Sequence, residues 1–393
     1  MKKKIFEFKN REYTEGAFYL SLSFLTMIWT LVIFNLCQYW DYEDHIKIAQ
    51  YWLIHEIDYS VILDCSVDIT HIFSYPVFHI TLKLVHLLFR IDYRTAVTVL
   101  MVTAEVTSVL IIRRIVSEYI GKTKSYYVDF TSLGLMVFLG ARCWLNGWVF
   151  YKLQGGPNPL HNPTIIFVRP IGLLCFYYFV KYLNNYKNAS RELVLFGLFS
   201  VISILTKPSF AVVFLPAMGI YTLAYMIKDR NLFLGIKTFI AVIPSLVVLF
   251  GQLAFMNSTS EIMSTTLHFG TYYDYSFLQV MGITVVLLPT IIVLFSWKEI
   301  KTNLAMGISL LAVVIGWIQF FCITQGGTND FIWGFELAIQ VATMVIMCYA
   351  YPKVDDAKSL VIRKRIAYGL FAYQVFNGLL YMYLIYKACD YRF

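Results

Sequence analysis

The chain alternates long apolar runs with short polar loops from one end to the other. Runs of about 20 apolar residues have the length that an α-helix needs to cross a bilayer. The pattern therefore predicts an all-α polytopic membrane protein whose whole length, residues 1–393, is one transmembrane domain. About eleven spans are expected, near residues 17–39, 95–112, 126–146, 165–183, 192–206, 208–227, 237–256, 276–296, 303–322, 333–351 and 366–386.

Residues 72–89 are also apolar, but their polar positions follow a helical repeat. The cationic side chains recur every three or four residues and so share one helix face: His79, Lys83, His86 and Arg90. A helix with one cationic stripe lies in the membrane interface and does not cross it. We therefore expect an interfacial juxtamembrane helix here, within a first outer loop of residues 40–94, followed by a helical bundle over residues 95–393.

The distribution of Lys and Arg predicts the orientation. With 72–89 outside the membrane, the arm at residues 1–16 and the basic loops fall on one side, which holds 22 of the 32 Lys and Arg residues. Cytoplasmic loops are enriched in these residues, so we predict a cytoplasmic N-terminus in the plasma membrane and an extracytoplasmic active face. That outer face receives all seven histidines and a loop, residues 40–71, with seven acidic residues and one basic residue.

Composition supports the membrane assignment. Hydrophobic residues make up 59% of the chain and charged residues 14%, against about 45–50% and about 25% in soluble domains. The net charge of +8 resides in the basic loops, so no nucleic-acid partner is indicated. The chain has no Walker A or GxGxxG pattern, and its seven cysteines include no CxxC pair, which leaves neither a nucleotide-binding motif nor a metal or disulfide framework.

An acidic segment follows the first predicted span directly. On a helix, Asp41, Asp44 and His45 would share one face, whereas Glu43 would point elsewhere. Such a face suits a general base or a cation site. The alternative is a solvated acidic loop that helps to keep this segment outside.

A second candidate site precedes the span near 165–183. Asn162 is a suitable N-cap and Pro163 suits the first helical position. A helix N-terminus with His161 before it and Arg169 about two turns inside suits a phosphate group. The alternative is a loop and cap without function, although an arginine within a span is costly and usually functional.

Two further turns lie on the predicted outer side. Lys207 stands in a tight Thr-Lys-Pro turn between two spans, where the alternative is a lysine that snorkels to the membrane surface. Asn329 and Trp333 begin another span and offer hydrogen bonding with an aromatic platform, as sugar sites often do. The alternative there is an interfacial tryptophan beside a flexible Gly-rich loop.

Three short motifs support a family resemblance. They are Asp41 followed by Ile48-Ala49, then Tyr75-Pro76, then Thr206-Lys207-Pro208. Together with the layout of the spans, they resemble the GT-C superfamily of polytopic glycosyltransferases, which includes protein O-mannosyltransferases and the lipid A aminoarabinose transferase. The family's DE or EE pair appears here as Asp-Tyr-Glu-Asp, which leaves Asp41 and Asp44 both open as the catalytic residue, with Asp41 preferred.

The resemblance implies an enzyme of cell-envelope glycan synthesis. A glycosyltransferase of this kind moves a sugar from a polyprenyl-phosphate donor to a hydroxyl of a glycan, lipid or protein acceptor, with Asp41 or Asp44 as general base. The residues expected to contact the lipid phosphate or the substrate are His161, Asn162, Arg169, Lys207, His79, Lys83, Asn329 and Trp333.

Two questions stay open from the sequence. Some relatives use a divalent metal, for which Asp44 and His45 are candidate ligands, but their spacing does not define a metal site, so no cofactor is assigned. The alternatives in function are a transporter or flippase of lipid-linked sugars and a polymerase or ligase of lipid-linked glycans.

Overall fold

The computed structural model describes residues 2–37, 40–51, 75–121, 126–137, 160, 162–259, 265–267, 302–325, 331–351 and 357–390. Twelve helices account for most of these residues. They are α1 (Lys2–Leu36), α2 (Trp40–Tyr51), α5 (Pro76–Phe89), α6 (Tyr93–Ile120), α7 (Tyr126–Val137), α8 (Pro163–Asn184), α9 (Ser190–Thr206), α10 (Ser209–Lys228), α11 (Leu232–Thr259), α15 (Leu304–Cys322), α16 (Ile332–Tyr349) and α17 (Lys358–Asp390).

Seven segments of the described chain are long and apolar enough to cross a membrane: Glu15–Leu36, Tyr93–Ile120, Pro163–Asn184, Ser209–Lys228, Leu232–Phe255, Leu304–Cys322 and Ile332–Tyr349. Each coincides with one of the predicted spans. The seven helices indicate a multi-pass membrane protein, as the hydrophobic pattern predicted.

The remaining predicted spans have different outcomes. Residues 192–206 form α9, and 366–386 lie within α17, yet neither helix is among the seven segments. Of 126–146, the structure describes only the part in α7, and 276–296 lie outside the described residues. The expected number of eleven spans therefore stays a prediction.

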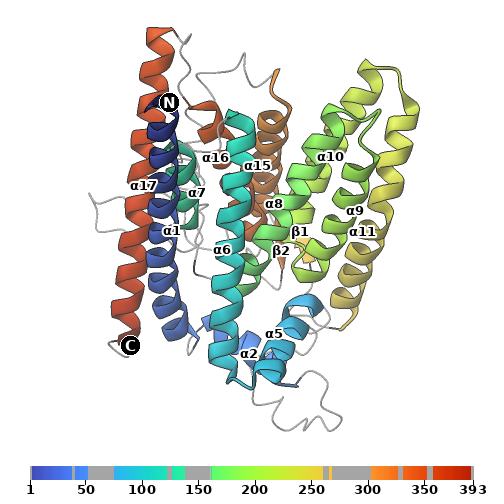
Figure 1. Ribbon diagram of the computed structural model, residues 1–393. Coiled ribbons are helices and arrows are strands. Elements are labelled where there is room, and N and C mark those ends of the chain that lie inside the picture. The colour runs from blue at the N-terminus through green and yellow to red at the C-terminus, as the bar shows by residue number, and fades with distance from the viewer. Residues whose placement is uncertain are drawn as a thin grey trace.

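The helices stand roughly upright and side by side (Figure 1). The chain begins at one end of the bundle, and α2 and α5 lie together across the opposite end, where the C-terminus of α17 also lies (Figure 1). The connection between α10 and α11 is at the end where α1 begins. The start of α1 and the loop between α10 and α11, which were both expected among the basic loops on one side, therefore lie at the same end of the bundle. Which end faces the cytoplasm stays a prediction.

Local sequence explains where several helices begin and end. Asp92 caps α6, since its carboxylate accepts a hydrogen bond from the Thr95 backbone N–H at 3.0 Å. Gly121 ends α6 with a φ of +72°, a conformation that glycine adopts without steric cost. Asn303 caps α15 by accepting from the Met306 N–H at 3.1 Å.

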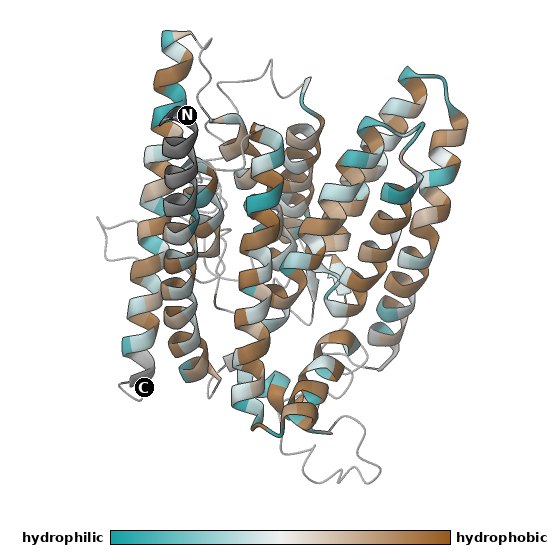
Figure 2. Ribbon diagram, viewed as in Figure 1, coloured by the Kyte–Doolittle hydropathy of each residue, from teal (hydrophilic) through white to brown (hydrophobic). Residues whose placement is uncertain are grey.

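Helix α16 occupies the centre of the bundle, and nearly all of it is buried. It packs closely on α15 because Gly316 leaves no side chain between the helices: a Cβ there would come within 2.9 Å of the Phe335 Cα. Small residues allow such close approach of helices in membranes. The outer helices expose apolar side chains instead, including Val247 at 66% and Phe239 at 59%. Figure 2 shows this hydrophobic character along most of the length of the upright helices.

Two short strands add a feature that the all-α prediction lacked. β1 (Thr265–Leu267) pairs antiparallel with β2 (Ile323–Gln325), which directly follows α15. The Thr266 and Thr324 hydroxyls lie 3.0 Å apart across the pair. The strands connect the chain after α11 with the segment between α15 and α16, near the end of the bundle that carries α2 and α5 (Figure 1).

Candidate functional site

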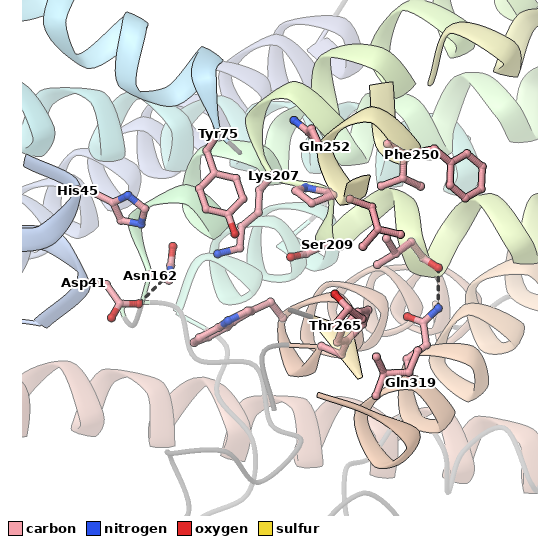
Figure 3. A pocket seen from close by; sticks show the side chains of 18 of the residues that line it. Asp41, His45, Tyr75, Asn162, Lys207, Ser209, Phe250, Gln252, Thr265 and Gln319 are labelled. Atoms are coloured by element: carbon pink, nitrogen blue, oxygen red, sulfur yellow. Dashed lines mark hydrogen bonds between the residues drawn. The ribbon is translucent and has the colours of Figure 1, made fainter. Parts of the chain in front are cut away.

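A cavity of about 490 Å³ lies between α2, the starts of α8, α10 and α16, the later part of α11, and the two strands. We call it the Asp41 cavity. Its polar wall includes Asp41, Asp44, His45, Asn162 and Lys207, and Figure 3 shows side chains from these distant segments pointing toward one another. Five of the predicted site residues therefore line this cavity, namely Asp41, Asp44, Asn162, Lys207 and Trp333.

Asn162 links the acidic helix to the start of α8. Its amide nitrogen donates to the Asp41 carboxylate at 2.7 Å (Figure 3). Its side-chain oxygen accepts from the Thr164 backbone N–H at 2.9 Å, so the predicted N-cap is confirmed, with Pro163 in the first turn as expected. The same side chain thus caps a helix and orients the carboxylate of Asp41.

The two faces of the acidic helix α2 differ as the spacing predicted. Asp41, Asp44 and His45 line the cavity. Glu43 points away and pairs with Lys47 at 2.9 Å, on a face where both side chains are partly exposed. The segment is therefore an ordered helix with one face on the cavity, in contrast to the alternative of a solvated loop.

Lys207 occupies the turn between α9 and α10, where it ends α9 before Pro208. Its side chain is only 4% exposed. The ammonium lies 5.1 Å from the centre of the Tyr75 ring and 5.5 Å from that of Trp333. Aromatic faces attract cations at such distances. The lysine is thus directed into the protein, which does not fit a residue that snorkels to the membrane surface.

Arg169 lies elsewhere than the sequence suggested. It forms an ion pair with Glu105 of α6, and both side chains are buried, at 5% and 0% exposed. The Cα of Arg169 is about two turns inside α8 and so roughly 10 Å deeper along the helix axis than that of Asn162. The cavity lining does not include it. A buried arginine needs a charge partner, and Glu105 in α6 supplies it.

The juxtamembrane helix α5 is a 14-residue helix, about 21 Å long and so too short to cross a core of about 30 Å. Two residues of its cationic stripe contact α2. His79 is fully buried, and its Nε2 lies 2.9 Å from Nδ1 of His45. The Lys83 ammonium donates to the Gln50 carbonyl at 3.0 Å, and partial burial lowers the pKa of Lys83. His79 and Lys83 therefore attach α5 to α2, whereas His86 lies 2.6 Å from the Ile91 carbonyl and Arg90 is exposed.

One wall of the cavity is apolar. Leu249, Phe250 and Leu253 of α11 contribute hydrocarbon surface there. The Gln319 amide, which also lines the cavity, donates to the Val212 carbonyl at 2.8 Å (Figure 3). The arrangement combines two carboxylates, a buried ammonium, aromatic rings and a hydrocarbon wall, so the cavity offers both polar and apolar contacts to an amphipathic ligand.

Tyr42 lies behind the acidic face, with its ring fully buried. Its hydroxyl has no hydrogen-bond partner among the described residues. Burial raises the pKa of Tyr42 well above its usual value, and the nearby charges of Glu105 and Asp41 add to this shift. The phenol therefore stays protonated.

Sequence reasoning placed some residues and missed others. His161 and Asn329 lie outside the described residues. Glu105 was missed, although an acidic residue in the middle of a predicted span is itself a signal. Gln319 and Thr265 were missed because neither belongs to a polar cluster in the sequence. Within the described part of the chain, no group of three or more His, Cys, Asp or Glu side chains is placed to hold a metal ion.

Comparison with known proteins assigns no family to the chain. No model of a known protein family matches the chain, and no curated protein matches it. The class that fold and cavity define is therefore a multi-pass helical membrane protein with an amphipathic cavity at one end of its bundle.

Proposed function

We propose that the protein is a membrane glycosyltransferase that moves a sugar from a polyprenyl-phosphate donor to an acceptor hydroxyl in the Asp41 cavity, on the extracytoplasmic face. One observation carries the proposal: Asp41 on α2 and Lys207 at the start of α10 line the same cavity, which has a hydrocarbon wall. A base, a cation for a phosphate and a surface for a lipid are the three requirements of this reaction.

The roles follow from the chemistry. The acceptor oxygen attacks the anomeric carbon, the bond from that carbon to the phosphate oxygen breaks, and the acceptor proton passes to the carboxylate of Asp41. The leaving lipid phosphate gains negative charge, which the ammonium of Lys207 stabilises. Asn162 positions Asp41 through the 2.7 Å hydrogen bond. Trp333 and Tyr75 flank Lys207 and offer ring faces for a sugar.

The test is an assay of lipid phosphate release. Proteoliposomes containing the full chain would receive a set of polyprenyl-phosphate sugars with mixed acceptors, and the freed polyprenyl phosphate would be measured. Wild type should release it from at least one donor, and Asp41→Asn should reduce the rate by about 10²-fold or more. Glu43→Gln is the matched control, because Glu43 pairs with Lys47 away from the cavity. An unchanged rate in Asp41→Asn would overturn the role of Asp41.

A transporter or flippase of lipid-linked sugars is the second candidate, and a specific observation favours it. The pair Glu105–Arg169 is buried between α6 and α8, and charges within spans often mark transport paths. A cavity of about 560 Å³, lined by Glu118, Tyr177 and Lys181, also lies toward the far ends of the same two helices. Movement of a labelled lipid-linked sugar across liposomes without release of lipid phosphate would support this candidate and contradict transfer.

A further inference from the structure

A second, apolar cavity of about 530 Å³ adjoins the Asp41 cavity. We call it the apolar groove; α10 and α11 form its sides, with Phe179 of α8 and Phe196 of α9 between them. Val212, Leu249 and Phe250 line both cavities, so the two spaces meet at these residues. On α10 the lining extends from Ala211 to Met226, about 22 Å along the helix axis and thus most of the depth of a bilayer core.

The wall of the groove offers little polar surface. Both of its threonine hydroxyls have partners: Thr222 donates to the Met218 carbonyl at 2.9 Å, and Thr238 donates to the Leu234 carbonyl at 2.9 Å and lies 3.1 Å from the Tyr182 hydroxyl of α8. Apart from these two threonines, the lining consists of aliphatic, aromatic, Met, Pro and Gly residues. A ligand here would gain only from burial of its own hydrocarbon, which contributes about 0.8 kcal/mol for each CH₂.

The groove opens sideways on the outside of the bundle. Leu223, Phe239 and Phe250 line it and are 50%, 59% and 61% exposed. These side chains belong to helices that are candidate spans, so their exposed surface faces lipid. A chain can therefore enter from the bilayer while its polar end reaches the Asp41 cavity.

We propose that the apolar groove between α10 and α11 binds the prenyl chain of a lipid phosphate whose phosphate lies near Lys207. The inference rests on the proposed function for the identity of the head group. The groove leads from a cavity that holds a buried ammonium, and it forms a single channel that suits one long chain. A two-chain phospholipid presents the same phosphate with a different hydrocarbon, and the experiment separates the two sources.

Gly219 provides the variant that tests the groove. It lies in the groove lining, and a Cβ there would meet nothing within 4 Å. Gly219→Leu therefore fills the groove without a clash in the protein. Gly251 of α11 also has open space around its Cα, but it lines neither cavity. Gly251→Leu is the matched control, since both changes replace a helical glycine by a better helix former.

The experiment measures binding to the purified full chain in nanodiscs, with a long-chain polyprenyl phosphate, farnesyl phosphate and dioleoyl phosphatidic acid as probes. The long-chain probe should bind wild type and Gly251→Leu at least about tenfold more tightly than farnesyl phosphate does. Gly219→Leu should remove most of that difference while its melting temperature stays at or above that of wild type.

Equal chain-length preference in Gly219→Leu and Gly251→Leu would overturn the groove assignment. Phosphatidic acid that binds as tightly as the long-chain prenyl phosphate would overturn the prenyl occupant. Because the readout is binding, a groove that passes this test without any sugar transfer would contradict the proposed function alone. Transfer that persists with no effect of Gly219→Leu on binding would contradict the groove alone.

Discussion

The two ends of the bundle hold cavities of similar size that place their charges differently. In the cavity that includes Lys181, the lysine pairs directly with Glu118 at 2.8 Å, and both side chains are more than 40% exposed. In the Asp41 cavity, the carboxylate of Asp41 contacts the neutral amide of Asn162, and Lys207 is buried against aromatic rings. One end pairs two opposite charges directly where both side chains are partly exposed, whereas the other places two carboxylates and a buried ammonium around one cavity.

This difference identifies the end at which chemistry is expected. An exposed ion pair contributes about 0–1 kcal/mol to stability and leaves little electrostatic potential for a ligand. A buried ammonium in a site of low dielectric interacts much more strongly with a developing negative charge.

The largest expected effect comes from neutralising the two lysines in turn. Lys207→Met should lower transfer from a polyprenyl-phosphate sugar by about 10²-fold, because the leaving phosphate loses its cation. Lys181→Met removes the same charge at the other end and should leave the rate within a factor of about three. Rates in proteoliposomes, with melting temperatures as the check on folding, test this pair. Equal losses in both variants would remove the distinction between the two ends.

The next effect concerns stability, which should fall when one member of the buried pair Glu105–Arg169 is replaced. Arg169→Met or Glu105→Met alone should lower the free energy of unfolding by about 3–5 kcal/mol, because each leaves a buried group without its partner. The double variant Glu105→Met with Arg169→Met should recover most of that loss. Denaturant unfolding in detergent measures all three. Additive losses in the double variant would show that the pair is not coupled.

A smaller loss of stability is expected from overpacking at the point where α16 crosses the start of α10. A Cβ at Gly334 would lie 2.6 Å from the Ser209 carbonyl oxygen and 2.6 Å from Val213. Gly334→Ala should therefore cost about 1–3 kcal/mol through overpacking and should weaken lipid phosphate binding, because Gly334 and Ser209 both line the cavity. Gly251→Ala, in open space, should be neutral or slightly stabilising. A thermal unfolding series that ranks the two alanines alike would contradict this packing argument.

The smallest effect concerns the cap of α6. Hydrogen bonds from the side chain and backbone of Thr95 hold the pKa of Asp92 below its usual value. A depressed pKa in the folded state contributes stability above the unfolded value of about 3.9, and this is lost as the pH falls through the folded value. Asp92→Ala should cost about 1 kcal/mol at neutral pH, and the gap to wild type should shrink in acid. A gap that is constant with pH would contradict the role of the charge.

The sequence predicted those features that depend on local patterns. Hydrophobic runs located the seven apolar spans, helical spacing placed Asp41, Asp44 and His45 on one face, and cap chemistry placed the start of α8 at Asn162. Each of these follows from residues within a few turns of one another.

The features that it missed depend on contacts between distant segments. Arg169 looked like a phosphate ligand because nothing in its own span showed that Glu105 on α6 would pair with it. His79 looked like part of an exposed cationic stripe, yet it is buried against His45. The strand pair of Thr265–Leu267 with Ile323–Gln325 joins three-residue segments, which are too short for an alternating pattern to reveal.

A structure of the full chain with a long-chain polyprenyl phosphate, determined by electron cryomicroscopy in nanodiscs, tests the central claim most directly. The account predicts phosphate density beside Lys207, on the side that faces Asp41, and chain density that continues between α10 and α11. Phosphate density beside Lys181 and Glu118 at the other end of the bundle, with the Asp41 cavity free of lipid, would contradict it.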